Sequence, residues 1–517
     1  MFKKASSTAD PTPAIDHALI ISVFVVASCG LAYELVNAAL ASYLLGDSVL
    51  QFSTIIGAYL FAMGIGSHLS QYIPEDQVLK RFIEIELLVG LIGGLSATLL
   101  FLSFAWIAAP FRPLLYAMVI LIGILVGMEV PLVMRVLNQR KAEFNALISR
   151  VLTFDYMGAL AVSLLFPLVL APMLGLARTA ILFGLCNVGV ACWTVWRFRQ
   201  ELHASYQQLM RRTVAVLLLL LVGFAVADRL VSWSESKLFG DPILYATTTP
   251  YQRLVLTRWQ NDLRLYINGN LQFSSTDEYR YHEALVHPVL QDRPAHSRIL
   301  ILGGGDGLAL REVLRYPDVK AVTLVDLDPA MTRIFSTNSD LVKLNQNSFA
   351  DPRVTVVNQD AAQWLEQHRE KYDVMIVDFP DPSNFGLGKL YSTPIYRLMR
   401  QHLQPHGRMV VQSTSPMYAP RAFWSVVATL QKAGLQTTPY HALVPSFGEW
   451  GFVIASQQAD FKIPRQYSLP MRFLDAMTTA QMFYFPKDMQ RVAAEPNDLN
   501  NQKLVQYFIQ DWSGVIR

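Results

Sequence analysis

The chain has 517 residues, of which 52% are hydrophobic and only 16% are charged. Because charged residues make up about 25% of a typical soluble domain, this composition excludes a wholly soluble enzyme and predicts that much of the chain lies in lipid. The net charge of +3 gives no indication of a nucleic-acid partner, and the length exceeds that of one ordinary domain.

The first part, residues 1–235, is predicted to be a multi-span helical membrane domain. Seven apolar stretches are candidate spans, and most have the length that roughly 30 Å of hydrocarbon requires: Ala18–Leu45, Phe52–Tyr72, Phe82–Ile107, Pro113–Leu137, Leu152–Ala171, Leu176–Trp196 and Thr213–Trp233. The seventh is the weakest because it is free of charge only as far as Ala227. Two pairs of glycines at a spacing of four predict close helix packing: Gly90 with Gly94, and Gly123 with Gly127.

The basic residues of the loops predict an orientation. One side carries Lys3, Lys4, Lys80, Arg81, Arg135, Arg140, Lys141, Arg150, Arg197, Arg199, Arg211 and Arg212, and the opposite side carries Arg112 and Arg178. This bias places the N-terminus in the cytoplasm of a multi-pass protein of the cell membrane. If all seven spans cross, the chain after Trp233 lies outside; if the seventh lies flat or re-enters, that part lies inside. The sequence leaves both open.

Four acidic residues lie within or near the predicted spans: Glu34, Glu86, Glu129 and Asp155. An ionised carboxylate in lipid is costly and usually faces a cavity or a partner. One interpretation is a binding or conduction site for a cation such as an amine; the other, which we favour, is hydrogen bonding at helix ends or between helices. The cysteines all fall in apolar runs without metal-ligand spacing, which predicts packing residues and no metal site: Cys29, Cys186 and Cys192.

A small β domain is expected over residues 236–290, where the composition changes. Leu263, Leu265 and Ile267 alternate with polar residues, as in a strand with one buried face. The Asn268-Gly269 pair that follows is typical of a two-residue hairpin turn. A helix is expected from about residue 277 to Leu290.

Residues 291–517 are predicted to form an α/β domain with a C-terminal extension. A strand at Ile299–Leu302 runs into a glycine cluster and a helix, and a second strand, Ala321–Val325, ends in Asp326. The glycines let the backbone approach a ligand, and the acid suits the hydroxyls of a ribose. Further strands are expected at Val354–Val357, Tyr372–Val377, Gly407–Gln412, Leu435–Tyr440 and Gly451–Ala455. Their alternation with helices predicts a parallel, doubly wound, Rossmann-like sheet of the class I methyltransferase type.

Four carboxylates fall at or just past the carboxyl ends of these strands: Asp306, Asp326, Asp360 and Asp378. Because ligands of doubly wound sheets bind at those ends, the sequence predicts an acidic cleft. Such a cleft favours a cation over a phosphate, and the glycine turn has no phosphate-loop lysine.

A nucleoside with a sulfonium and an amine tail would fit this cleft. Asp326 would hold the ribose, Asp360 the adenine amine and Asp306 the cationic tail. Asp378 and Asp381 would hold a second amine. Asp378 could accept its proton, so that the neutral nitrogen attacks the carbon next to sulfur.

Residues from Tyr251 to about Ser456 resemble the spermidine synthase (polyamine aminopropyltransferase) family. The resemblance is carried by Tyr251-Gln252, Asp277-Glu278 with Tyr281-His282-Glu283, Gly303-Gly304-Gly305-Asp306-Gly307, Asp326, Gln359-Asp360-Ala361, and Asp378 with Asp381-Pro382. The first half resembles the multi-span segment fused to a bacterial subgroup of this family. That likeness lies in Tyr33-Glu34, in residues 127–131 and in residues 155–159.

The resemblance implies transfer of the aminopropyl group of decarboxylated S-adenosylmethionine, a co-substrate with no further cofactor, to an amine. The default acceptor is putrescine, which gives spermidine and methylthioadenosine. It implies nucleoside binding by Gln252, Gly303, Gly304, Gly305, Asp326, Asp360 and Ala361. It implies contact with the amine or aminopropyl group by Tyr281, His282, Asp306 and Asp381, with Asp378 as general base. Asp306 should select the decarboxylated form, whose tail lacks a carboxylate. A homodimer is also implied.

Alternatives remain for the residues and for the function. Asp378 and Asp381 could form a proline turn, His282 could be a helix-start residue, and Asp360 could be the N-cap of the helix that follows. The chain departs from the family at residues 379–380, 383–388 and 445–450, so the acceptor amine stays open. The other functions considered are a polyamine sensor or transporter with an enzyme-like domain, and a methyltransferase that uses intact S-adenosylmethionine. Asp306 argues against the methyltransferase.

Overall fold

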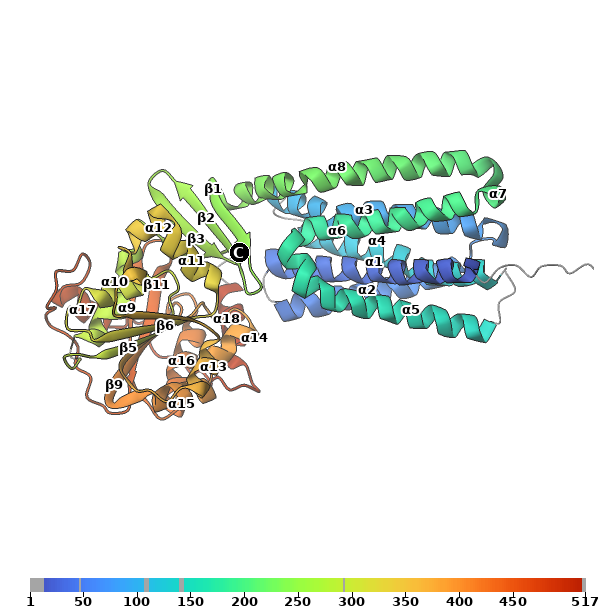
Figure 1. Cartoon of the computed structure of the whole chain (residues 1–517). Coiled ribbons are helices and arrows are strands. Elements are labelled where there is room, and N and C mark those ends of the chain that lie inside the picture. Colours follow the sequence, from blue (N-terminus) through green and yellow to red (C-terminus); the bar gives the residue numbers. More distant parts are fainter. Residues whose placement is uncertain (1–13, 46–47, 107–110, 139–143, 292, 514–517) are drawn as a thin grey trace, which may run out of the picture. The chain divides into compact units, whose positions relative to one another are not determined.

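The computed structural model describes residues 14–45, 48–106, 111–138, 144–291 and 293–513. The chain falls into two compact units, Met1–Asp241 and Pro242–Arg517, which Figure 1 shows as a set of helices and a pair of sheets with their covering helices. Four of the basic residues on which the predicted orientation rests lie outside the described residues: Lys3, Lys4, Arg140 and Lys141.

The first unit is built from long apolar helices. These are α1 (Ala14–Leu45), α2 (Ser48–Ser70), α3 (Val78–Trp106), α4 (Phe111–Asn138), α5 (Phe144–Leu165), α6 (Ala171–Arg197) and α8 (Tyr206–Phe239), with the short α7 (Arg199–Leu202) before α8. By length and composition, 6 stretches of the described residues could cross a membrane, and one of them, Ile148–Arg197, takes in most of α5 and all of α6. Six of the seven sequence-predicted stretches fall largely on these helices, with residues 166–170 in a π-helical segment between α5 and α6; the third falls on α3 except for Ile107, which lies outside the described residues.

Glycines let the helices of this unit approach closely, as their spacing predicts. A Cβ on Gly127 of α4 would lie 2.1 Å from the Met63 carbonyl oxygen of α2. A Cβ on Gly90 of α3 would lie 2.9 Å from the Gly184 carbonyl oxygen of α6. Because both contacts are with backbone atoms, no side chain fits at either glycine, and the predicted close packing is confirmed.

Two acids of this unit do not behave as we expected from the sequence. Glu86 of α3 and Glu129 of α4 are 0% exposed, and none of their carboxylate oxygens has a hydrogen-bond partner among the described residues. The favoured interpretation, hydrogen bonding at helix ends or between helices, is therefore wrong for these two. The reason is that both side chains lie among packed apolar helices, away from the polar helix ends.

The second unit begins with a four-stranded antiparallel sheet in the order β1-β2-β3-β4. Its strands are β1 (Ile243–Thr248), β2 (Arg253–Trp259), β3 (Asp262–Ile267) and β4 (Asn270–Ser274). Asn268 and Gly269 join β3 to β4 with positive φ angles of 50° and 82°, the geometry of a tight hairpin turn. The predicted hairpin is confirmed.

A seven-stranded sheet follows, in the order β10-β11-β9-β8-β5-β6-β7. Its strands are β5 (Arg298–Gly303), β6 (Ala321–Asp326), β7 (Val354–Asn358), β8 (Tyr372–Asp378), β9 (Leu403–Gln412), β10 (Gln436–Val444) and β11 (Gly448–Ser456). Strands β5 to β9 are parallel, as predicted. The prediction of a wholly parallel sheet is wrong, because β11 runs antiparallel to both of its neighbours, β10 and β9. Residues 445–447, which join β10 to β11, are too few for the crossover helix that a parallel pair would need.

Helices cover both faces of this sheet. Leu300 and Leu302 share one core with α13 (Ala361–Gln367), α15 (Thr393–Gln401) and α16 (Pro420–Lys432). Ile299 and Ile301 share another with α9 (Glu278–Leu290) and α10 (Leu308–Leu314). Successive residues of a strand point to opposite faces, so one apolar run supplies both cores. The strand order changes direction at β5, and the carboxyl end of β5 is therefore the expected ligand position.

Candidate active site

The glycine turn after β5 brings the ends of three strands together. Gly303 pairs with Asp378 of β8 at a φ of +82°, and a Cβ there would lie 2.2 Å from the Asp378 carbonyl oxygen. A Cβ on Gly305 would lie 2.6 Å from the Asp326 carboxylate. The Gly305 amide instead donates a 3.0 Å hydrogen bond to Asp326 Oδ2. These positions require glycine for the strand ends to meet.

Two of the predicted acids lie on this turn and beside it. Asp306 Oδ1 accepts a hydrogen bond of 2.9 Å from the amide of Leu308, the first residue of α10. Burial raises the pKa of Asp306, although the nearby His282 opposes this change. Burial also raises the pKa of Asp326 to about 6, and the charge of Asp306 adds to the increase. Asp306 is close enough for its charge to act on Asp326, so a cation beside the two carboxylates would be favoured.

Asp378 ends β8 and is held by a tyrosine from α9. The Tyr281 hydroxyl donates a 2.5 Å hydrogen bond to Asp378 Oδ1, while Oδ2 accepts no hydrogen bond from any described residue. Burial and the charge of Asp306 raise the pKa of Asp378 to about 6, although the charge of His282 and the Tyr281 hydrogen bond oppose this rise. Asp378 is therefore a stronger base than an ordinary carboxylate and is still mostly ionised at neutral pH.

His282 is anchored by an ionic network that the sequence did not reveal. Its Nδ1 lies 2.8 Å from Glu278 Oε2, and Arg311 of α10 donates two hydrogen bonds of 2.9 Å to the same Glu278 carboxylate. Burial opposes the charged form of His282, but the hydrogen bond and charge of Glu278, together with the charges of Asp306 and Asp378, outweigh it and raise the His282 pKa. His282 is therefore a buried residue of the first turns of α9 that Glu278 holds in place, and both its ligand role and its role as a satisfied helix-start residue stay predictions.

Asp381 belongs to a second polar group, which was also missed. Gln412, the last residue of β9, donates to the Phe379 carbonyl at 2.6 Å and lies 3.4 Å from Asp381 Oδ1. Trp450 Nε1 of β11 donates to Gln412 Oε1 at 3.2 Å. Burial raises the pKa of Asp381 to about 7, and the hydrogen bond from Gln412 opposes this rise. Gln412 thus links the segment that follows β8 to strand β11.

The remaining predicted residues lie at the ends of neighbouring elements. Gln252 Nε2 donates to Asp328 Oδ2 at 3.0 Å, and Asp328 caps α11 (Pro329–Thr337), just after β6. Asp360 Oδ1 accepts from the Gln363 amide at 3.0 Å and caps α13, as the alternative interpretation had it. Ala361, the first residue of α13, is buried. Among the described residues, no hydrogen bond or ion pair joins Asp360 to Asp306, Asp326 or Asp378.

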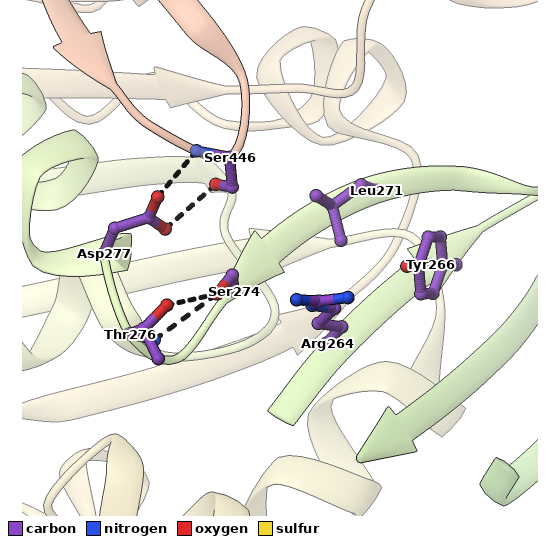
Figure 2. Close-up of a pocket in the computed structure, with 7 residues that line it drawn as sticks. All are labelled: Arg264, Tyr266, Leu271, Ser274, Thr276, Asp277 and Ser446. Carbon is purple, nitrogen blue, oxygen red and sulfur yellow. Dashed lines mark hydrogen bonds between the residues drawn. The ribbon is translucent and has the colours of Figure 1, made fainter. Parts of the chain in front are cut away.

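A pocket of about 360 Å³ opens beside α9 (Figure 2). It is lined by Arg264, Tyr266, Leu271, Ser274, Thr276, Asp277 and Ser446. Asp277, which precedes α9, accepts hydrogen bonds of 2.6 and 2.9 Å from the amide and hydroxyl of Ser446 in the β10–β11 turn (Figure 2). None of the predicted carboxylates lines this pocket. The two hydrogen bonds between Ser446 and Asp277 fix the start of α9 to the β10–β11 hairpin. They thereby also position Tyr281 and His282, which lie on α9.

The site formed by Asp306, Asp326, Asp378 and Asp381 is anionic and half-buried. One of its carboxylates, Asp378, is held by a hydrogen bond from Tyr281. Such a set can bind a desolvated cation and can accept a proton from it at Asp378. It contains no lysine or arginine directed at the glycine turn among the described hydrogen bonds and ion pairs, so it does not resemble a phosphate site.

Comparison with known proteins gives matches over the whole chain. A model of the family described as "Spermine/spermidine synthase domain" matches residues 278–466. The "Polyamine aminopropyltransferase 2" of Ralstonia nicotianae is 64% identical over 503 residues, which cover 96% of this chain and 99% of the relative. The "Polyamine aminopropyltransferase" of Leptospira interrogans is 48% identical over 500 residues, with coverage of 96% and 99%.

Two solved structures match about half of the chain. A crystal structure of spermidine synthase from Thermotoga maritima is 23% identical and has a TM-score of 0.43, covering 48% of this chain and 87% of that one. A spermidine synthase in complex with the transition-state analogue AdoDATO is 23% identical with a TM-score of 0.44, covering 48% and 88%.

Proposed function

Because this chain belongs to the polyamine aminopropyltransferase family, we propose that Asp378 is the base that activates the acceptor amine of its transfer reaction. Aminopropyl transfer itself, predicted from the sequence, is confirmed by these relatives. The observation that carries the proposal is the position of Asp378. It lies at the switch point of the sheet, held at one oxygen by Tyr281, with a pKa of about 6.

The co-substrate in this proposal is decarboxylated S-adenosylmethionine. Asp326 accepts hydrogen bonds from the ribose hydroxyls, and Asp360 accepts one from the adenine amine. Oδ2 of Asp360 lies 3.6 Å from Lys389 Nζ, and this ion pair orients the Asp360 carboxylate. Asp306 faces the ammonium end of the aminopropyl group. His282, anchored by Glu278, lies next to Asp306 and keeps this side of the site in place.

The reaction is a substitution at the carbon next to sulfur. The lone pair of the acceptor nitrogen forms the new C–N bond as the C–S bond breaks, and the electron pair of that bond stays on sulfur as methylthioadenosine leaves. The proton that the nitrogen must lose goes to Asp378 Oδ2. Asp381 binds the distal ammonium of the acceptor, with putrescine as the default acceptor.

The rate of transfer should fall in acid. Asp378 works as an ionised carboxylate and its pKa is raised to about 6, so lowering the pH through 6 protonates it and removes the base. Asp381, with a pKa of about 7, loses its charge slightly earlier. We expect the acid limb of kcat/KM between pH 6 and 7, as one composite transition. A rate that stays constant down to pH 5 would contradict the assignment of these groups.

Asp306 should determine the choice between the two forms of the nucleoside. Intact S-adenosylmethionine would place a carboxylate against Asp306, and like charges in contact cost several kcal/mol. Replacing Asp306 with Asn keeps the acceptor for the Leu308 amide but removes the repulsion. We expect the ratio of dissociation constants for the intact and decarboxylated forms to fall at least about tenfold. Calorimetric titration measures both. Asp488→Asn, at an exposed position, is the control, and an unchanged ratio would refute this role.

We further propose that the helical unit lies in the cell membrane with its N-terminus in the cytoplasm. Six stretches have the necessary length and composition, and α5 and α8 expose large apolar side chains such as Leu160, Leu164, Leu218 and Val222. Such a surface is unfavourable in water. The protein should sediment with membranes, resist alkaline carbonate and dissolve only in detergent. Release by carbonate would contradict this placement. The homodimer stays a prediction, to be checked by the mass of the detergent-solubilised protein.

A further inference from the structure

A buried carboxamide fastens the loop that follows β8 and carries Asp381. Gln412, the last residue of β9, is 2% exposed. Its Nε2 donates hydrogen bonds of 2.6 Å to the Phe379 carbonyl and 2.7 Å to the Tyr391 hydroxyl, and it lies 3.4 Å from Asp381 Oδ1. The Tyr391 hydroxyl in turn donates to the Phe379 carbonyl at 3.0 Å. Gln412 therefore holds this loop both by its backbone and by the Asp381 carboxylate.

The orientation of the carboxamide is set by two donors. Gln412 Oε1 accepts hydrogen bonds of 3.2 Å from Trp450 Nε1 and from the Thr414 amide. Both partners are N–H groups, which cannot accept a hydrogen bond, so the oxygen must face them and Nε2 must face the loop of Asp381. Without the indole N–H of Trp450, the Thr414 amide alone would hold Oε1.

The backbone after β9 adopts a strained conformation at this contact. Thr414 is fully buried with a φ of 55°, in the left-handed region that β-branched residues rarely enter. Its carbonyl accepts a 2.6 Å hydrogen bond from the amide of Gly451, the residue after Trp450. A Cβ on Gly451 would lie 2.7 Å from that carbonyl oxygen, so the close approach requires glycine. The strained turn therefore joins β9 to β11 where the indole N–H reaches Gln412.

A row of aromatic rings places Trp450 in the active site. The centroid of the Phe447 ring lies 6.2 Å from that of Tyr281 and 5.3 Å from that of Trp450. At one end of the row, the Tyr281 hydroxyl holds Asp378. At the other end, the Trp450 indole holds Gln412. The row therefore runs from the proposed base to the group that positions the second carboxylate.

The Asp381 carboxylate is held in place but is not neutralised. Among the described residues, no ion pair reaches Asp381; Lys389, which follows it in the chain, pairs with Asp360 at 3.6 Å instead. Such a carboxylate favours an ammonium ligand. Because Gln412 fixes it before the ligand arrives, the cost of ordering it on binding is small. That advantage depends on the N–H of Trp450.

We propose that Trp450 is a positioning residue of the acceptor site, which through Gln412 holds Asp381 in place for the distal ammonium of a diamine. Trp450 thereby determines how strongly the enzyme prefers a diamine to a monoamine, which has no second ammonium. The proposal deepens the proposed function and rests on it, since the distal ammonium is assigned there to Asp381. Trp450 itself contacts no reacting atom.

Transfer to two amines of equal chain length tests this role, because putrescine has a distal ammonium and butylamine has none. Trp450→Phe keeps an aromatic ring beside Phe447 but removes the N–H that Gln412 accepts. We expect kcat/KM for putrescine to fall about tenfold, through KM, as for a lost hydrogen bond that supports a charged contact. The value for butylamine should not change. An equal fall for both amines would overturn the proposal, since a merely structural change affects both.

Two further variants isolate the contact. Trp424 Nε1 donates to the Met489 carbonyl at 3.4 Å, so Trp424→Phe is the matched loss of an indole hydrogen bond and should leave the ratio of the two amines unchanged. Combining Trp450→Phe with Asp381→Asn should lower kcat/KM for putrescine no further than Asp381→Asn alone, because both changes act on one contact. Additive losses would contradict a role through Asp381.

Calorimetry of amine binding decides the role of Trp450 without any transfer. The full-length protein in detergent, saturated with methylthioadenosine, is titrated with putrescine. We expect the Kd for putrescine to rise at least about tenfold in Trp450→Phe, while methylthioadenosine binding is retained and shows that the variant is folded. Trp450→Tyr, which also lacks the indole N–H, is the second variant with the same expectation.

The outcomes separate this inference from the proposed function. An unchanged Kd for putrescine in the variants, or no binding of putrescine by the wild-type protein, would overturn the role of Trp450. A wild-type protein that binds putrescine but transfers nothing to it would contradict the proposed function, while the change in Kd would still decide the role of Trp450.

Discussion

Replacing Asp378 with Asn should lower kcat about 100- to 10,000-fold, the usual contribution of a positioned general base. The amide has the size of the carboxylate and still accepts the hydrogen bond that Tyr281 donates to Oδ1, but it cannot take a proton from the amine. Methylthioadenosine release at saturating substrate measures the effect.

The control for this substitution has two parts. Asp488→Asn changes the same groups at an exposed position and should leave kcat within about twofold, as surface changes usually do. Binding of the decarboxylated nucleoside to the Asp378→Asn protein should be retained, which shows that the site is still formed. Turnover of this variant at the wild-type rate would remove Asp378 from the role of base.

Replacing Arg311 with Met should destabilise the sheet unit by about 3–5 kcal/mol, the typical cost of leaving a buried ion without its partner. Arg311 is 7% exposed. It donates to Glu278 at 2.9 Å, to Glu312 at 2.9 Å and to the Leu344 carbonyl at 2.8 Å. Two carboxylates would remain buried, and His282 would lose the anchored Glu278 that holds it.

Hydrogen exchange of the α9 and α10 amides in the full-length protein measures this change. Arg298→Met is the matched control, because Arg298 pairs with Glu370 at the surface with 42% and 51% of the two side chains exposed. Such a pair contributes about 0–1 kcal/mol. If Arg311→Met and Arg298→Met lowered protection equally, the buried network would not have the structural role given to it here.

The acids at the strand ends could be predicted because their arrangement follows from a simple rule. The carboxyl ends of parallel strands meet at one edge of a sheet. Asp306, Asp326 and Asp378 therefore come together although they are distant in the chain. The glycines between β5 and α10 carry the same information, since a Cβ at Gly303 or Gly305 would overlap the neighbouring strand end.

The groups that hold these acids could not be predicted. Arg311 reaches Glu278 across 33 positions, and Trp450 reaches Gln412 across 38. No periodic pattern or turn signal encodes such a pair. It depends on the packing of α10 against α9 and of β11 against β9, which is settled only when the whole unit folds.

In the helical unit, too, some features could be predicted from the sequence and others could not. The spacing of Gly90 and Gly127 predicted close helix contacts, because a missing side chain has a direct geometric consequence. The same sequence could not tell whether Glu86 and Glu129 point outward to a polar helix end or inward. That depends on the rotation of each helix, which no local motif specifies.

An assay of aminopropyl transfer on the purified full-length protein tests the central claim most directly. Decarboxylated and intact S-adenosylmethionine are each offered with a panel of amines, and both products are quantified by mass spectrometry. We predict that methylthioadenosine and an aminopropylated amine form in equal amounts, only from the decarboxylated form and only with an acceptor present. Methyl transfer from the intact form, or methylthioadenosine release that does not depend on any amine, would contradict the account.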